Sequence, residues 1–125
     1  ADIRLPDRVV RDVRFIVDTA ADRTVLTAGL LPALPELLPA PADTQLSGVG
    51  GASEYGILEG TLEFLRPGLL PVTVRGSVAV FTELSALDMS VLGRDVTDHF
   101  DVMISRRRDA VLILGGSHRF VVVGP

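Results

Sequence analysis

The sequence predicts an all-β fold, and three observations carry this prediction. Several short runs alternate apolar and polar residues with a period of two, as strands with one buried face do. β-branched and aromatic residues are concentrated in the same runs. Glycine and proline lie between the runs and interrupt any long helix. Because the chain has 125 residues and is 47% apolar, we expect one compact domain over residues 1–125.

The first half of the chain contains one clear strand and two irregular stretches. Residues 13–17, "VRFIV", predict a strand that ends directly before Asp18. Residues 28–42 are rich in proline, which predicts a connection packed by leucines, with one short turn of helix. Residues 47–56, "SGVGGASEYG", place glycines around Val49 between strand-like residues. This pattern predicts a β-hairpin with a flexible, apolar tip.

Two longer strands follow, each with an apolar and a polar face. In residues 58–64 the polar face holds Glu59, Thr61 and Glu63, and the apolar face holds Leu58, Leu62 and Phe64. In residues 72–80 the polar face holds Thr73, Arg75 and Ser77, and the apolar face holds four valines: Val72, Val74, Val78 and Val80. We expect the apolar faces of both strands to form the core.

The C-terminal part predicts one short helix and a series of short strands. Val96 and Phe100 are four residues apart in "RDVTDHF", residues 94–100, which favours one or two helical turns. Strands are predicted at residues 100–104, 110–114 and 119–123. Arg106, Arg107 and Arg108 lie between two of them, as in a solvated hairpin tip.

Composition excludes several classes of function. The net charge is −4, which is not the basic balance of a nucleic-acid binder. There is no cysteine, and neither His99 nor His118 has metal-ligand spacing, so we expect no metal site and no cofactor. No run reaches the roughly 18 apolar residues that a membrane span needs. We therefore expect a soluble domain, with the cytoplasm as the default compartment.

Two further features concern the origin of the chain. All twelve basic residues are arginine, and both lysine and asparagine are absent. This bias is typical of a GC-rich genome, so we expect a bacterial source. The chain begins with Ala1 rather than Met, from which we expect a processed form or a piece of something longer.

Asp18 is the first candidate for chemistry. A carboxylate directly after three apolar residues stands at the edge of a core, where ionisation is costly. The alternative is that Asp18 and Thr19 only begin a turn, because both side chains bond nearby backbone N–H groups at strand ends. The glycines around Val49 are equally compatible with a plain hairpin turn. A phosphate-binding loop is disfavoured because no GxxxxGK[ST] motif is present.

Three segments in order resemble the retropepsins, the single-domain aspartic proteases of retroviruses and their cellular and bacterial relatives. They are "VDTAADRTVL" from residue 17, the "GVGG" tip at 48–51, and "SVLGRDVTDHF" at 90–100. The resemblance spans about residues 13–104. It implies the retropepsin fold, a closed β-barrel-like subunit with a flap hairpin and one short C-terminal helix.

The resemblance also implies an aspartic endopeptidase. Asp18 would be the catalytic aspartate, and Thr19 would reach across to the partner subunit and lock the two active-site loops together. The mechanism needs two carboxyls that share one proton, and the chain supplies one. A homodimer acting on polypeptide, with an Asp18 from each chain on the two-fold axis, would follow.

Further residues take roles from the same resemblance. Asp22 would pair with Arg94 of the "GR" motif and meet the substrate backbone; a merely solvated Arg94 is the alternative. The hairpin at residues 48–50 would be the flap, with Gly48 and Gly50 as hinge material around Val49. An extended peptide with apolar side chains would bind between the flap and the residues Ala20, Ala21 and Val25.

The sequence departs from the family at Ala20, since the family triplet is normally Asp-Thr-Gly or Asp-Ser-Gly. The added methyl group lies where substrate and the catalytic loops meet, so it narrows the cleft or weakens the lock. The alternative function is therefore a dimeric binding or assembly module with the same fold and little or no turnover. A further alternative is an unrelated all-β interaction domain in which the three motifs coincide by chance.

Overall fold

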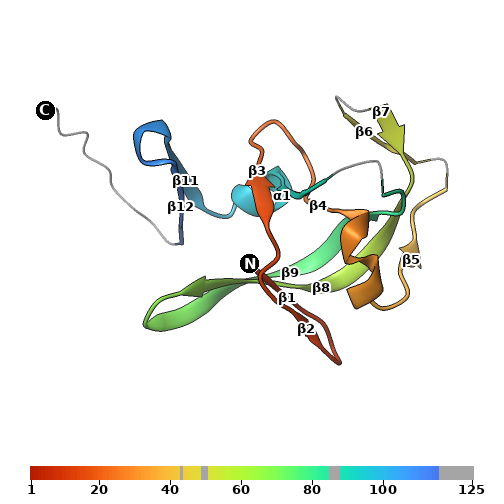
Figure 1. Ribbon diagram of the computed structural model, residues 1–125, viewed down its shortest axis with the longest axis horizontal. Helices are drawn as coiled ribbons and strands as arrows, with labels where there is room; N and C mark the ends of the chain where they lie inside the picture. Colours follow the sequence, from red (N-terminus) through yellow and green to blue (C-terminus); the bar gives the residue numbers. More distant parts are fainter. Residues whose placement is uncertain (43, 49–50, 85–87, 116–125) are drawn as a thin grey trace, which may run out of the picture.

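The computed structural model describes residues 1–42, 44–48, 51–84 and 88–115, and Figure 1 shows a largely β structure built around one curled sheet. The sheet has eight strands in a half-barrel, with the order β2-β1-β8-β9-β4-β10-β3, and β5 pairs with β8 beside this path. These strands are β1 Asp2–Arg4, β2 Val9–Val10, β3 Phe15–Val17, β4 Val25–Leu26, β5 Leu38–Pro39, β8 Tyr55–Arg66, β9 Leu69–Phe81 and β10 Ser90–Leu92.

Two separate strand pairs lie beside this sheet in the described part of the chain. One consists of β6 Leu46–Gly48 and β7 Gly51–Ser53, and the other of β11 Asp101–Ser105 and β12 Ala110–Leu114. The helical segments are short. Among the described residues they are the 3-10 helices η1 Ala28–Ala33 and η2 Arg106–Arg108, and the α-helix α1 Arg94–Thr97.

The long β8–β9 hairpin is the centre of the sheet, and its alternation follows the predicted pattern. The two strands pair antiparallel from Tyr55↔Phe81 to Arg66↔Leu69, with an irregularity after Phe64. Gly68, at a φ of 70°, makes the turn between them, a conformation that favours glycine. Four residues of the predicted apolar faces are buried: Leu58, Leu62, Val78 and Val80.

Glu63 is buried although the alternation places it on the polar face. Strand β1 lies beside it in the sheet, with Asp2 opposite Glu63 in the β1–β8 register, and both side chains are buried. The Arg4 guanidinium donates to both carboxylate oxygens of Glu63, at 3.0 and 2.9 Å. A buried carboxylate needs such a partner, so this pair attaches the N-terminal strand to the sheet.

The core is formed by aliphatic residues far apart in sequence. Phe64 of β8 and Phe100, which follows α1, meet edge to face with ring centroids 5.7 Å apart. This contact joins the C-terminal segment to the central hairpin. The main cluster of buried residues is Ile3, Leu5, Val13, Leu26, Leu34, Leu58, Leu62, Val78, Val80, Leu92 and Val96.

The proline-rich stretch forms the short helical turn that the sequence predicts. Thr27 caps η1 by accepting a hydrogen bond from the Gly29 N–H, and Pro32 lies inside this 3-10 segment. Leu34 then enters the core. The segment is thus a connection packed by leucines.

The C-terminal predictions are confirmed for the helix and for the first two strands. Residues 94–97 form α1, and the two strands pair in register from Asp101↔Leu114 to Ser105↔Ala110. The three arginines form the exposed turn η2 between them. The strand predicted at residues 119–123 lies outside the described residues. In the part of the chain that is described, no helix is long and apolar enough to cross a membrane.

Candidate active site

Asp18 stands where β3 leaves the sheet. Strand β3 runs parallel to β10, with Val17 opposite Leu92. The Asp18 N–H continues the pairing for one residue by donating to the Leu92 carbonyl at 3.1 Å. The chain then turns away into a loop, residues 18–24, and the Asp18 side chain is half-buried at its start.

The loop closes around the Asp18 carboxylate. The Ala20 N–H donates to Asp18 Oδ1 at 2.9 Å, and the Ala21 N–H donates to the Asp18 carbonyl at 3.2 Å. This is the turn that the alternative interpretation of Asp18 predicts. The same hydrogen bond also fixes the direction of the carboxylate, which is what a catalytic acid requires.

The loop is attached through its backbone to the start of α1. The Arg94 N–H donates to the Ala21 carbonyl at 2.8 Å, and the Asp95 N–H donates to the Asp22 carbonyl at 3.2 Å. Two segments about seventy residues apart thus satisfy each other's backbone groups. The position of the Asp18 loop depends on residues 93–95.

A buried side-chain network reinforces this attachment. Thr24 is fully buried; its N–H and its hydroxyl both donate to Asp95 Oδ1, at 2.8 and 2.7 Å. The Thr24 hydroxyl oxygen in turn accepts from the Gly93 N–H at 3.0 Å. Sequence analysis missed Thr24 and Asp95, because a threonine at a strand start and an acid in the first turn of a helix are common at purely structural positions.

Gly93 is required by close approach of the two segments. A Cβ atom at this position would lie 2.4 Å from the Arg23 carbonyl carbon and 2.8 Å from the Thr24 nitrogen. Both are backbone atoms, so no side-chain rotation could relieve the clash. The backbone of the Asp18 loop therefore lies directly against Gly93.

Asp22 and Arg94 form an ion pair across the same junction. Both side chains are exposed. The hydrogen bond to Asp22, with the charge of that carboxylate, raises the pKa of the Arg94 guanidinium above its ordinary value. Exposed ion pairs contribute little to stability, so the buried Thr24 network is the stronger tie and the ion pair sets the position of the two side chains.

Comparison with known proteins assigns the chain to a family. The family model described as retroviral aspartyl protease matches residues 3–105. The chain belongs to this family. Among solved structures it is similar to the EIAV protease complexed with the inhibitor HBY-793, with 22% sequence identity, 78% of this chain and 83% of that chain covered, and a TM-score of 0.54. None of the curated proteins compared with the chain matches it.

The family assignment confirms the resemblance inferred from the three motifs, and the structural similarity confirms the all-β retropepsin fold. Two of the motifs, at residues 17–26 and 90–100, are the segments that the hydrogen bonds around Gly93 bring together. The third, the glycine-rich tip, belongs to β6 and β7. Figure 1 shows this strand pair and the Asp18 loop on the same, upper side of the molecule.

The remaining predicted site residues lie in different surroundings. Thr19 and Ala20 are exposed on the Asp18 loop, and Ala21 in the same loop is half-buried. Val25 is buried in β4, where it packs with Tyr55 and Ala79. Its role as a substrate contact stays a prediction.

Part of the predicted flap is described. Gly48 ends β6 and lies opposite Gly51, which begins β7 with a φ of 102°. Val49 and Gly50 lie outside the described residues. An open pocket of about 520 Å³ lies at the base of this hairpin and shares no residue with the Asp18 loop; it is lined by Ala40, Thr44, Gln45, Glu54 and Tyr55.

Proposed function

We propose that this protein is a homodimeric aspartic endopeptidase that hydrolyses peptide bonds in extended polypeptides. The observation that carries the proposal is the Asp18 carboxylate, which follows β3 and accepts a hydrogen bond from the Ala20 N–H. The chain that carries it belongs to the retroviral aspartyl protease family. The mechanism needs two such carboxyls, and the chain has this motif once. Two copies related by a two-fold axis would bring the two Asp18 side chains together.

The proposed chemistry is acid–base activation of water. Two adjacent carboxyls share one proton, because like charges so close cannot both ionise. The ionised Asp18 takes a proton from water as the water oxygen attacks the scissile carbonyl carbon, while the protonated Asp18 of the other chain donates its proton to the carbonyl oxygen. The C–N bond of the resulting tetrahedral diol then breaks: the Asp18 that took the proton gives it to the leaving amine nitrogen, and the other Asp18 takes a proton back from a diol hydroxyl as the carboxyl product forms. We assign no metal and no cofactor to this reaction.

The surrounding residues would position the chains and the substrate. The exposed side chain of Thr19 is available to reach the loop of the partner. Asp22, held by Arg94, would meet the substrate backbone. The flap, residues 48–50, would close over the peptide and bind it as an added strand against Ala20, Ala21 and Val25.

We assign the whole chain, residues 1–125, to one domain. The family match ends at residue 105, within the β11–β12 hairpin. Every residue of β12 pairs with a residue of β11, from Ala110↔Ser105 to Leu114↔Asp101. A domain boundary at residue 105 would divide this pair, whereas boundaries usually fall where few contacts cross.

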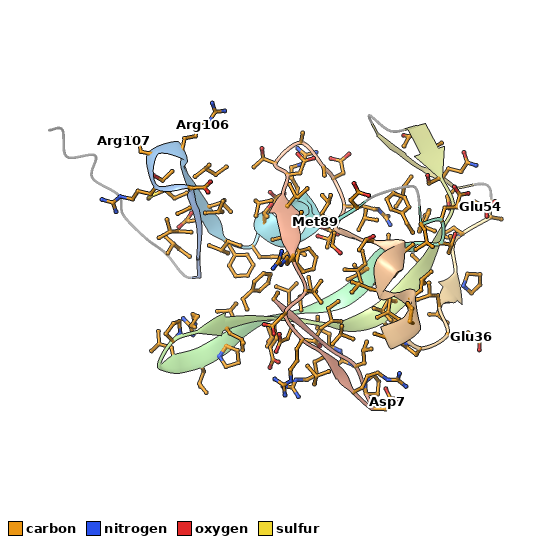
Figure 2. The ribbon with its side chains drawn as sticks, viewed as in Figure 1. Asp7, Glu36, Glu54, Met89, Arg106 and Arg107 are labelled. Atoms are coloured by element: carbon orange, nitrogen blue, oxygen red, sulfur yellow. The ribbon has the colours of Figure 1, made fainter. Side chains whose placement is uncertain are left out.

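The test is cleavage profiling of a peptide library between pH 4 and pH 7. We expect the wild-type protein to cut, and we expect Asp18→Asn to abolish every cut. Asp7→Asn is the matched control, because Asp7 is exposed and its partner is the neighbouring Arg8; Figure 2 shows it at the lower end of the molecule. Cuts that persist in Asp18→Asn and resist a pepstatin-like inhibitor would contradict the proposal.

One observation favours the second candidate function, a dimeric binding module without useful turnover. Ala20 is exposed beside the Asp18 carboxylate, where the family has glycine. If its methyl group crowds the substrate, Ala20→Gly should raise kcat/KM about fivefold, which corresponds to about 1 kcal/mol, the lower end of the cost of one extra carbon in a packed site. If neither the wild type nor Ala20→Gly cuts while both dimerise, the binding module is the correct function.

A further inference from the structure

The far end of the β8–β9 hairpin carries leucine side chains that the rest of the described chain leaves in solvent. Leu65, Leu69 and Leu70 keep exposed fractions of 64%, 66% and 82%. Among the large apolar side chains of the described residues, Leu70 has the largest exposed fraction. We call residues 65–70 the leucine tip. Single exposed apolar residues are ordinary on a protein surface, whereas a cluster of them indicates contact with a partner.

The leucine tip is a narrow turn rather than a flat surface. It consists of the last two residues of β8, the turn at Pro67 and Gly68, and the first two residues of β9. Figure 1 shows this hairpin extending beyond the rest of the sheet at one end of the molecule. A narrow apolar turn needs a matching pocket in order to bury itself against another protein. A lipid layer needs no such pocket, because it deforms around the side chains that enter it.

The backbone of the leucine tip is suited to an apolar medium, in which an unpaired N–H or carbonyl group is costly. Pro67 has no N–H, and neither has Pro71, which directly follows the tip. The Arg66 guanidinium donates through Nε and Nη2 to the Leu70 carbonyl, at 2.8 and 2.6 Å. Few backbone groups of the turn therefore lose a water partner when the tip enters lipid.

Arginines accompany the leucine tip, although the net charge of the chain is −4. Residues 64–76 contain two arginines and no acidic residue. Within the described part of the chain, Arg66 forms no ion pair. Figure 2 shows Arg106 and Arg107 toward the same end of the long axis of the molecule. Leucines flanked by arginines complement a bilayer with anionic headgroups, since guanidinium groups bind lipid phosphates while the leucines enter the apolar layer.

We propose that the leucine tip docks the protein on the surface of an anionic lipid bilayer. The three leucine side chains enter the boundary between headgroups and acyl chains, and Arg66, Arg106 and Arg107 lie among the lipid phosphates. This inference does not rest on the proposed function. Figure 1 shows the leucine tip and the β6–β7 hairpin at opposite ends of the molecule, so a docked chain keeps the predicted flap away from the lipid.

Co-sedimentation with lipid vesicles tests the proposal. The wild-type protein should bind vesicles of phosphatidylcholine mixed with phosphatidylglycerol, and it should bind less when phosphatidylglycerol is omitted or salt is added. The tip variant Leu69→Ser/Leu70→Ser should weaken binding about tenfold or more, because apolar area buried in the bilayer is lost. Leu38→Ser/Leu84→Ser is the matched control and should bind like the wild type, since both leucines are exposed outside the tip.

The contribution of charge is tested separately. The variant Arg66→Gln/Arg106→Gln/Arg107→Gln should lose about tenfold or more in affinity for the anionic vesicles, because each arginine near an anionic surface favours binding. Its binding to phosphatidylcholine alone should not change. Arg75→Gln, an exposed position in β9 outside the tip, is the control. An unchanged affinity of the triple variant for anionic vesicles would overturn the assignment of an anionic surface.

Fluorescence tests whether the tip itself enters the bilayer. The chain has no tryptophan, so Leu70→Trp supplies a unique fluorophore. With anionic vesicles its emission should move to shorter wavelength and be quenched by lipids brominated in their acyl chains, whereas Leu84→Trp should show neither change. Circular dichroism verifies that each variant is folded.

Three outcomes would overturn the inference. They are a wild-type protein that stays in the supernatant with anionic vesicles, a tip variant that binds as tightly as the wild type, and an emission of Leu70→Trp that the brominated lipids do not quench. The first outcome would leave a protein with a matching pocket as the occupant of the leucine tip. None of these outcomes affects the proposed function, which is judged by peptide cleavage without lipid.

Discussion

At the scale of single residues, the candidate active site depends on groups that hold the Asp18 loop rather than on the carboxylate alone. Asp18, Asp22 and Arg94 were predictable because they lie in short motifs that a reader can compare with a family. Thr24 and Asp95 were not, because their hydrogen bonds join positions 71 residues apart. Nothing local in the sequence marks such a pair. The burial of Glu63 was missed for the same reason, since it depends on which strand lies beside β8.

Gly93 is the described glycine at which an added Cβ should lower the free energy of unfolding most. In Gly93→Ala the new Cβ meets the backbone of Arg23 and Thr24, so the loop has to move. We expect a loss of about 3 kcal/mol in the free energy of unfolding, measured by urea denaturation, together with a loss of cleavage. Gly76→Ala is the control, because a Cβ there has no atom within 4 Å. Equal stability of the two variants would contradict the close contact at Gly93.

Thr24 provides a test of the buried network. Thr24→Val keeps the shape of the side chain but removes the hydroxyl that bonds Asp95 and accepts from the Gly93 N–H. We expect a loss of about 2 kcal/mol in unfolding free energy, because buried polar groups lose their partner. Thr24→Ser retains the hydroxyl and should keep most of that stability. If Thr24→Val and Thr24→Ser have the same free energy of unfolding, the hydroxyl does not hold the loop in place.

At the scale of elements, the prediction of a strand depended on its length or on a local signal. The three-residue β3 had such a signal in its apolar, β-branched run, and the β6–β7 hairpin had one in its glycines. The long β8 and β9 carry enough residues to show alternation, and the five-residue β11 and β12 could be predicted from their runs of apolar and β-branched residues. The strands β1, β2, β4 and β10 have two or three residues each, which is too few for a period of two to appear. Their pairing is dictated by the tertiary structure.

The β6–β7 hairpin should respond to mutation independently of the rest. It pairs only within itself among the described strands, and Gly51 has a φ of 102° that an L-residue adopts with strain. We expect Gly51→Ala to lower kcat/KM about tenfold, equivalent to about 1.4 kcal/mol of strain in closing the flap. The urea midpoint should not change, because the hairpin opens locally. A shifted midpoint with unchanged kinetics would show that this hairpin is structural and does not act as a flap.

At the scale of the whole molecule, the order of the strands and the half-barrel could not be read from the sequence. Alternation predicts which face of a strand is buried, but it does not say which strand lies next to it. The family assignment supplied what the pattern could not. The requirement for a second chain follows from the chemistry of the carboxyl pair once the retropepsin resemblance makes Asp18 the catalytic aspartate, and it stays a prediction.

Subunit exchange tests that requirement without any knowledge of the interface. When wild-type protein is mixed with an equal amount of Asp18→Asn and allowed to exchange, only half of the wild-type chains find a wild-type partner. Activity per wild-type chain should therefore fall to about half. An Asp7→Asn partner should leave activity per active chain unchanged. Activity that is insensitive to Asp18→Asn would mean that a single chain carries the complete site.

The attachment of the Asp18 loop to residues 93–95 also has a consequence for the newly made protein. Contacts so distant in sequence form slowly, and they cannot form before both segments have left the ribosome. At a synthesis rate of roughly 5–20 residues per second, the loop waits about 4 to 14 s for its anchor. During that interval the Asp18 loop of the nascent polypeptide lacks its anchor, so the proposed catalytic centre cannot assemble before residues 93–95 have left the ribosome.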